Sequence, residues 1–216
     1  MPFNLSNYNK INDFIEKNTQ KKVKIIAISK YHPVESIMEG VHSGLRIFGE
    51  NRVQEAKSKY FKLKDTFKDI ELHLTGPLQT NKVKNALQIF DVFQTLDREK
   101  LANEFHKYKD GLQEKSFFVQ INTGKELSKS GVYAEVADEF IKYCLYDLKL
   151  SVVGLMCIPP SLESPTPHFS LLRKIAEKNN LKQLSMGMSG DYEKAILGGA
   201  THIRVGTALF GSRGDK

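Results

Sequence analysis

Hydrophobic positions in this chain alternate between short continuous apolar runs and stretches in which apolar residues recur every three or four positions. The first pattern is typical of buried strands, and the second is typical of helices with one buried face. The predicted strands are residues 22–29, 47–49, 72–75, 91–96, 117–121, 152–158, 183–186 and 202–205. A helix is predicted after each strand except the last.

Strict alternation of strands and helices predicts an α/β fold with a parallel sheet. Eight repeats fit a single closed (β/α)8 barrel, the TIM barrel, and we expect one domain over residues 1–216. An open doubly wound sheet is the main alternative. It is disfavoured because the chain has no Gly-x-Gly-x-x-Gly turn after the first predicted strand.

The segment before the first predicted strand has the pattern of an amphipathic helix. Its apolar stripe consists of Leu5, Tyr8, Ile11, Phe14 and Ile15. After the eighth strand, residues 209–216 are too few for a full helix. We therefore expect the N-terminal helix to replace the last outer helix and to cover the gap between the eighth and first strands.

Composition narrows the class of protein. Apolar residues make up 40% of the 216 positions, which is typical of a globular chain, and no apolar run is long enough to cross a bilayer. No secretory signal is visible at the start of the chain. The two isolated cysteines, Cys144 and Cys157, do not form a disulfide framework or a metal site. We expect a cytoplasmic protein without a membrane partner.

The charge balance is basic, with 32 Lys and Arg against 25 Asp and Glu and a formal net charge of +7. A nucleic-acid binder is one interpretation of that excess. The basic residues mostly alternate with acidic ones, however, and the densest run, residues 57–64, has the pattern of a solvated helix face. Attraction to small phosphorylated molecules explains the balance equally well, and we expect no nucleic-acid partner.

Two loops near the end of the chain have the composition of an anion site. In TIM barrels, phosphate groups commonly bind to the loops after the seventh and eighth strands. Here those loops contain small residues and two hydroxyls, including Ser189, Gly206 and Thr207. Each loop alone is explained as well by a helix cap or a turn. Both together, at these places, predict phosphate binding.

Lys30 directly follows the first predicted strand. An amine at the mouth of an apolar barrel is partly desolvated, which favours the neutral nucleophile that forms a Schiff base with an aldehyde. A strand-end lysine that simply reaches into water is the alternative. Asn51 places an amide at the same rim after the second strand, or else caps a helix. His73, inside the third strand, has the position of a hydrogen-bonded core histidine.

Seven motifs occur in order along nearly the whole chain, from about residue 23 to residue 213. They are AISK at 27–30, FGENRVQE at 48–55, HLTGPLQTNK at 73–82, SKSG at 128–131, GLMCIP at 154–159, LSMGMS at 184–189 and IRVGTALFG at 203–211. With these motifs the chain resembles the pyridoxal phosphate homeostasis protein family, single-domain relatives of the N-terminal barrel of alanine racemase. It departs from the family pattern at residues 94–96, at Gly190 and in the loop 123–127.

The resemblance implies that pyridoxal 5′-phosphate (PLP) is the cofactor and that Lys30 carries it as an internal aldimine. It also implies that Arg204 faces the pyridine nitrogen and that Asn51 lies beside the ring, while the loops hold the phosphate. The complete set of expected cofactor-binding residues is Lys30, Asn51, Met188, Ser189, Arg204, Gly206 and Thr207.

The family resemblance further implies a protein of PLP homeostasis that holds and releases the cofactor without strong catalysis. PLP enzymes usually hold the ring nitrogen protonated with a carboxylate, and the always cationic Arg204 cannot replace that partner. Alanine racemase takes its second acid/base, a tyrosine, from another domain of the partner subunit, and we expect this chain to have no such domain. The alternative is a low-activity PLP-dependent amino-acid racemase. We expect a monomer, with PLP-dependent apoenzymes as candidate recipients.

Overall fold

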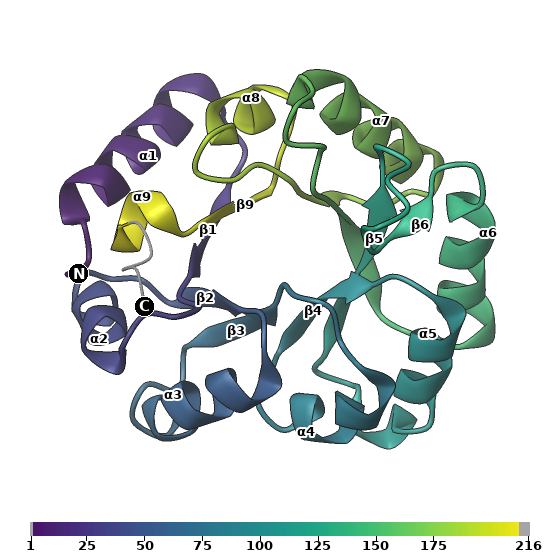
Figure 1. The fold of residues 1–216 in the computed structure, drawn as a ribbon, viewed down its shortest axis with the longest axis horizontal. Coiled ribbons are helices and arrows are strands. Elements are labelled where there is room, and N and C mark those ends of the chain that lie inside the picture. The colour runs from purple at the N-terminus through teal and green to yellow at the C-terminus, as the bar shows by residue number, and fades with distance from the viewer. Residues whose placement is uncertain (1, 212–216) are drawn as a thin grey trace.

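The computed structural model describes residues 2–211, which form a closed barrel of eight parallel strands surrounded by helices (Figure 1). The barrel strands are β1 (Lys24–Ile28), β2 (Ile47–Glu50), β3 (Glu71–Leu74), β4 (Val92–Leu96), β5 (Ser116–Asn122), β7 (Val152–Cys157), β8 (Gln183–Ser185) and β9 (His202–Val205). Neighbouring strands follow the order β4-β3-β2-β1-β9-β8-β7-β5, and a β4–β5 pairing closes the ring. The predicted (β/α)8 barrel is therefore confirmed.

The helices form the outer layer, and Figure 1 shows them around the ring. They are α1 (Leu5–Asn18), α2 (Val34–His42), α3 (Val53–Thr66), α4 (Val83–Leu87), α5 (Glu99–His106), α6 (Ala137–Lys142), α7 (Pro165–Lys178), α8 (Tyr192–Leu197) and α9 (Thr207–Phe210). Short 3₁₀ turns cover Thr80–Lys82 and Lys109–Gly111, and a π-helical turn covers Tyr143–Asp147. None of the helices in the described part of the chain has the length and apolar character needed to span a membrane.

The N-terminal helix α1 packs against α8 and α9, where it takes the place of a full last outer helix. The backbone N–H of Asn4 donates to the Leu209 carbonyl at 2.7 Å, and the Asn7 amide donates to the Ala208 carbonyl at 2.9 Å. The structure confirms this predicted replacement. Leu5 does not belong to the buried stripe, because its first-turn position leaves it 47% exposed. Of the final segment 209–216, residues 212–216 lie outside the described residues.

The region after β5 differs most from the sequence-based expectation. A ninth, two-residue strand, β6 (Val132–Tyr133), pairs with β5 and was not predicted. Helix α6 begins at Ala137, and Val136 lies just before this first helical residue and is half exposed. A two-residue strand has no periodicity to detect, and the helix start depends on how the β5–α6 loop packs.

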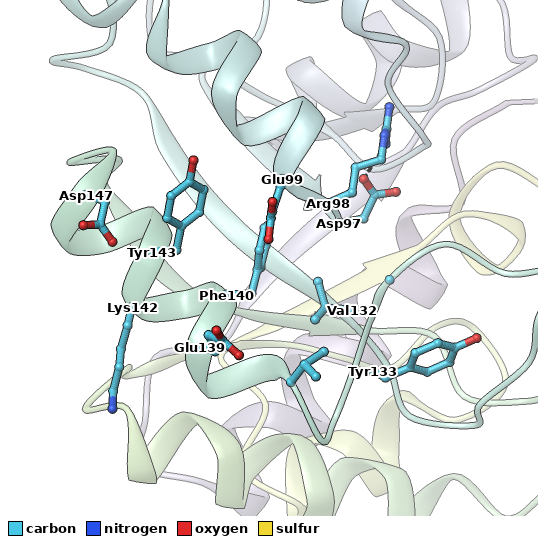
Figure 2. A pocket seen from close by; sticks show the side chains of 12 residues that line it. Asp97, Arg98, Glu99, Val132, Tyr133, Glu139, Phe140, Lys142, Tyr143 and Asp147 are labelled. Atoms are coloured by element: carbon cyan, nitrogen blue, oxygen red, sulfur yellow. Dashed lines mark hydrogen bonds and ion pairs between the residues drawn. The ribbon is translucent and has the colours of Figure 1, made fainter.

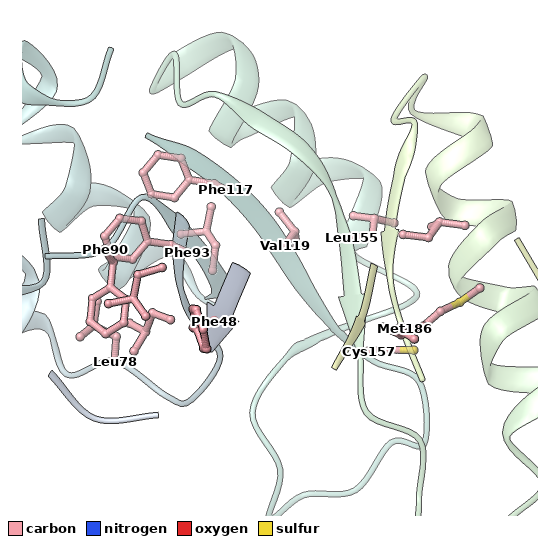
Figure 3. Packing of buried hydrophobic residues seen from close by; sticks show 14 of the residues in the cluster. Phe48, Leu78, Phe90, Phe93, Phe117, Val119, Leu155, Cys157 and Met186 are labelled. Atoms are coloured by element: carbon pink, nitrogen blue, oxygen red, sulfur yellow. The ribbon is translucent and has the colours of Figure 1, made fainter. Parts of the chain in front are cut away.

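The apolar core lies mainly between the outside of the barrel and the helices. Phe93 stacks on Phe117 at 5.5 Å between ring centroids, and Phe105 meets both rings edge-on at 4.8 Å. Figure 3 shows Phe93 and Phe117 on neighbouring strands, with Leu155 further along the sheet. Inside the ring, Phe118 and Met156 belong to a small apolar cluster. Buried polar side chains lie inside the ring as well. This arrangement leaves the strand ends free to carry functional groups.

Candidate functional site

A cavity of about 310 Å³ opens at the carboxyl ends of β1 and β9, beside the loop after β8. Its lining residues are Ile28, Lys30, His32, Met188, Ser189, Gly190, Arg204, Gly206, Thr207 and Gly211. Six of the seven residues expected from the sequence therefore line one cavity, although their segments lie more than 150 positions apart. This cavity has an amine on one segment and hydroxyls on two others.

Lys30 is positioned by the end of β1, which is anchored to β2 and α3. The Ser29 N–H donates to the Gly49 carbonyl at 3.0 Å, and the Lys59 ammonium donates to the Ser29 carbonyl at 2.9 Å. The Ser29 hydroxyl donates to Glu50 Oε1 at 2.7 Å. Ser29 is fully buried, so the residue before Lys30 is held by hydrogen bonds on both its backbone and its side chain.

A buried cluster beneath Lys30 was missed by the sequence reasoning. Glu50 is fully buried, and Lys59 approaches its Oε1 at 3.1 Å. Tyr60 is also buried, and its hydroxyl lies 2.6 Å from that of Ser29. Burial raises the pKa of Glu50, while the nearby Lys59 charge opposes that rise. Glu50 lies in the motif at 48–55, and Lys59 and Tyr60 follow that motif, but only the fold shows that they meet at Ser29.

The loop after β8 depends on a glycine in the left-handed region. Gly187 has φ +91°, and a Cβ at this position would lie 2.4 Å from Cβ of Ala195. Its carbonyl accepts the Arg204 N–H at 2.9 Å, which ties the loop to β9. Asp191, not Ser189, is the N-cap residue of α8, and its carboxylate accepts the Met188 N–H at 2.6 Å. The helix-cap explanation of Ser189 is therefore wrong.

Ser189 instead faces the loop after β9. Its hydroxyl accepts hydrogen bonds from the Thr207 hydroxyl at 3.3 Å and from the Ala208 N–H at 3.4 Å. Gly206 begins the short turn α9, and its carbonyl accepts the N–H groups of Leu209 and Phe210. Hydroxyls and small residues from two loops thus converge at the cavity, an arrangement suited to an anion because backbone N–H groups can approach it closely.

Arg204 is buried within the barrel mouth and also lines the cavity. Its Nη1 donates to the Ser185 hydroxyl at 2.8 Å, and its Nη2 donates to the Cys157 carbonyl at 2.8 Å. Desolvation lowers the pKa of Arg204, but a guanidinium stays protonated at neutral pH. Among residues 2–211, none of the ion pairs within 4.0 Å involves it. It is a buried cation held by neutral partners.

Asn51 is not brought to the same cavity. It lines a neighbouring depression of about 570 Å³ with Arg52, Lys82 and Arg98. Its side-chain carbonyl accepts the Thr75 hydroxyl at 3.0 Å, and a Cβ on Gly76 would collide with its backbone. The expected role of Asn51 beside a ring stays a prediction.

His32 is a lining residue that the sequence reasoning missed. It follows Lys30 by two positions, and its ring lies 5.1 Å from that of Phe210. Burial lowers the pKa of His32, and the positive charge of Lys59 adds to that effect. Its closeness to Lys30 in the chain was the available signal. His73, by contrast, is a buried core histidine whose two ring nitrogens are both hydrogen-bonded, as expected.

A larger cavity of about 630 Å³ lies between α5 and α6 and contains none of the expected site residues (Figure 2). Asp97 and Arg98 lie at one end of it, and Tyr143 and Asp147 lie at the other. Size alone does not select the functional site, because the amine and the anion loops converge on the smaller cavity.

Comparison with known proteins identifies the family of the chain. The family model described as "Alanine racemase, N-terminal domain" matches residues 5–214. A "Pyridoxal phosphate homeostasis protein" of Aquifex aeolicus is 42% identical over 201 residues, covering 88% of this chain and 87% of the relative. The protein of the same name from Escherichia coli strain K12 is 34% identical, covering 89% of this chain and 87% of the relative.

Solved structures extend the comparison. PipY of Synechococcus elongatus, with PLP bound, has a TM-score of 0.82 and 31% identity, covering 96% of this chain and 99% of PipY. Alanine racemase of Corynebacterium glutamicum has a TM-score of 0.70 at 15% identity, covering 96% of this chain and 60% of the racemase, and shows the shared fold alone. The extent of the family match and the identity to full-length relatives lead to one conclusion: the chain belongs to the pyridoxal phosphate homeostasis protein family, within the alanine racemase N-terminal domain fold.

Proposed function

We propose that this protein binds PLP in the 310 Å³ cavity, holds it through a Schiff base on Lys30, and releases or transfers it in vitamin B6 homeostasis. The observation that carries the proposal is the convergence of Lys30, Arg204, Ser189 and Thr207 on one cavity. The names of the relatives and the PLP bound to PipY support the same ligand.

The donor set fits the chemistry of PLP. The amine of Lys30 condenses with an aldehyde, forming a C=N bond and releasing one water. Ser189, Gly206 and Thr207 supply hydroxyl and backbone donors for the phosphate. Arg204 supplies N–H donors for the ring nitrogen, and Gly190 lines the cavity without adding a side chain. When bound, PLP supplies a reactive aldehyde and an electron-accepting ring.

We propose storage and transfer of the cofactor in place of strong catalysis. An arginine opposite the ring nitrogen disfavours protonation of that nitrogen, and a neutral ring is a weaker electron sink. The titratable side chains among the described lining residues are Lys30, His32 and Arg204. A weak racemase is the second candidate, favoured by His32, an imidazole acid or base that lines the cavity. Exchange of the α-hydrogen of alanine with deuterated water, lost in His32→Asn, would support it.

The decisive experiment is reduction of the PLP-loaded protein with borohydride, followed by peptide mass mapping. We expect a yellow protein and a reduced PLP adduct on the peptide that contains Lys30. Lys30→Ala abolishes the adduct, whereas Lys22→Ala, a control at an exposed lysine of the same segment, leaves it unchanged. A colourless protein in which Lys30→Ala binds PLP as well as the wild type would refute the proposal.

Transfer to PLP-dependent apoenzymes, a cytoplasmic location and a monomeric state complete the proposal. Cys144 and Cys157 are buried free thiols, which suits a reducing compartment. Transfer is tested by mixing the loaded protein with an apoenzyme at increasing concentration. A rate that rises with apoenzyme concentration supports direct contact, and a rate that equals dissociation into buffer supports transfer through solution. Light scattering tests the monomer.

A further inference from the structure

A chain of buried hydrogen bonds runs through the barrel interior from Arg204 on β9 to Glu71 at the start of β3. Arg204 Nη1 donates to Ser185 Oγ at 2.8 Å, and Ser185 Oγ donates to Gln94 Oε1 at 2.6 Å. Gln94 Nε2 lies 2.8 Å from His73 Nδ1, and His73 Nε2 lies 2.8 Å from Glu71 Oε1. Four strands, β9, β8, β4 and β3, contribute one member or more.

The direction of every bond in this chain is determined by its ends. A guanidinium only donates, so Ser185 accepts from Arg204 and its own hydrogen is free for Gln94. The Glu71 carboxylate only accepts, so His73 carries its proton on Nε2 and accepts at Nδ1. The Gln94 amide must then direct Nε2 toward His73 and Oε1 toward Ser185. If the Gln94 amide were flipped, His73 would carry its proton on Nδ1. Its unprotonated Nε2 would then face the Glu71 carboxylate.

The direction of these hydrogen bonds matters because the side chains that form them are buried. Ser185 and Gln94 are fully buried, and His73 and Arg204 are at most 4% exposed. A cation in such surroundings is costly without compensating negative charge, and Asp191 is one acid whose charge acts on Arg204. Burial also lowers the pKa of His73, so the ring stays neutral and retains Nδ1 as an acceptor. Every donor in the chain is directed from Arg204 toward Glu71, so the aligned dipoles favour both end charges.

We propose that Glu71 is a second, remote counter-charge of Arg204, besides Asp191, and that Gln94 and His73 are positioning residues which hold the guanidinium toward the cavity. Lys24 donates to both Glu71 oxygens, at 3.0 and 3.3 Å, and keeps the carboxylate ionised. His202 faces His73 at 6.1 Å between ring centroids. The proposal rests on the proposed function only in that Arg204 is taken to contact the ligand.

The test uses nitrogen-15 NMR of the Arg204 guanidinium in the protein without added PLP. Glu71→Gln removes the terminal charge with little change of shape, and Gln94→Leu interrupts the chain. The matched control is Asp69→Asn, which neutralises an exposed acid two residues before Glu71 that pairs with Arg46. We expect the solvent exchange of the Arg204 N–H groups to become about ten-fold faster in both test variants, as for loss of one hydrogen bond to a charged group. The control should match the wild type.

A second readout separates positioning from general destabilisation. PLP affinity should fall about ten-fold in Glu71→Gln, while inorganic phosphate, whose proposed partners are Ser189 and Thr207, should bind as in the wild type. Failure of the proposed function would show as no PLP binding in any variant, while the NMR result would still decide this inference. Unchanged Arg204 exchange in Glu71→Gln overturns the counter-charge, and unchanged exchange in Gln94→Leu overturns the positioning role.

The wild-type protein provides a test that needs no variant to fold. Nitrogen-15 shifts of the His73 ring distinguish its two neutral tautomers and the charged form. We expect Nε2 protonated and Nδ1 unprotonated at neutral pH. Either a charged imidazolium or protonation at Nδ1 would overturn the inferred direction of the chain.

Discussion

The hydroxyl of Thr207 donates to the hydroxyl of Ser189 across 3.3 Å, joining the loops that follow β9 and β8. Both hydroxyls line the cavity that contains Lys30. Each side chain therefore orients the other before any anion binds. An anion that contacts both would gain from donors that are already in place, which reduces the ordering cost of binding.

This contact predicts coupled effects on phosphate recognition. Ser189→Ala and Thr207→Val should each weaken PLP binding about ten-fold, because each removes one hydrogen bond to a charged group. The double variant should lose less than the sum of the two free-energy changes, since each hydroxyl positions the other. Titration of PLP absorbance measures all three. Thr66→Val, at the end of α3, is the control, and strictly additive losses would contradict the coupling.

Gly187→Ala should reduce both stability and ligand affinity. The new Cβ would lie 2.4 Å from Ala195, at a backbone φ of +91° that side chains disfavour. We expect a loss of more than about 1 kcal/mol in the free energy of unfolding. Gly190→Ala in the same loop is the stability control, because its Cβ would meet nothing within 4 Å. Equal melting temperatures for the two variants would argue against this account.

Lys59→Met should destabilise the protein by about 3 kcal/mol, because it leaves the buried Glu50 carboxylate without its cation. The double variant Lys59→Met/Glu50→Gln should recover part of the loss, since an amide needs no counter-charge. Lys68→Met removes an exposed ion pair with Asp65 and should change stability by less than about 1 kcal/mol. Urea unfolding measures all three. A double variant less stable than Lys59→Met would oppose the assignment.

Acid should weaken the fold through His202 and Glu71. Burial lowers the pKa of His202 to about 3, and the hydrogen bond from His73 is the main cause that lowers the pKa of Glu71 to about 2. Between pH 6.5 and 3 the unfolded chain binds a proton at His202 that the folded chain does not, so stability falls as the pH falls. Glu71 adds to this loss between pH 4.5 and 2.

The measurement is the free energy of unfolding against pH for the wild type and His202→Phe. Removing one such proton should reduce the slope by about 1.4 kcal/mol per pH unit between pH 6 and 4. Glu71→Gln should flatten the curve only below pH 4.5. An unaltered slope in His202→Phe would mean that the buried ring does not resist protonation.

Much of the architecture follows from local pattern. The strand at 202–205 was predicted with the bounds that the structure gives it, because a short apolar run reflects burial directly. Lys30 was assigned to the barrel mouth because it follows a strand, and strand ends in this fold meet at one rim. Ser189 and Thr207 were assigned to one phosphate site from the sequence, because they lie in the loops after the seventh and eighth strands.

The sequence by itself determined the closed barrel and which segments reach its mouth, since periodicity and chain order are local properties. Only the tertiary structure decided that Asn51 turns into a neighbouring depression, that Glu50 lies buried under Ser29, and that Arg204 is joined to Glu71 through the barrel. These outcomes depend on side-chain direction and on contacts between residues up to 91 positions apart. No local pattern encodes them, because barrel closure is what brings the partners within hydrogen-bond distance.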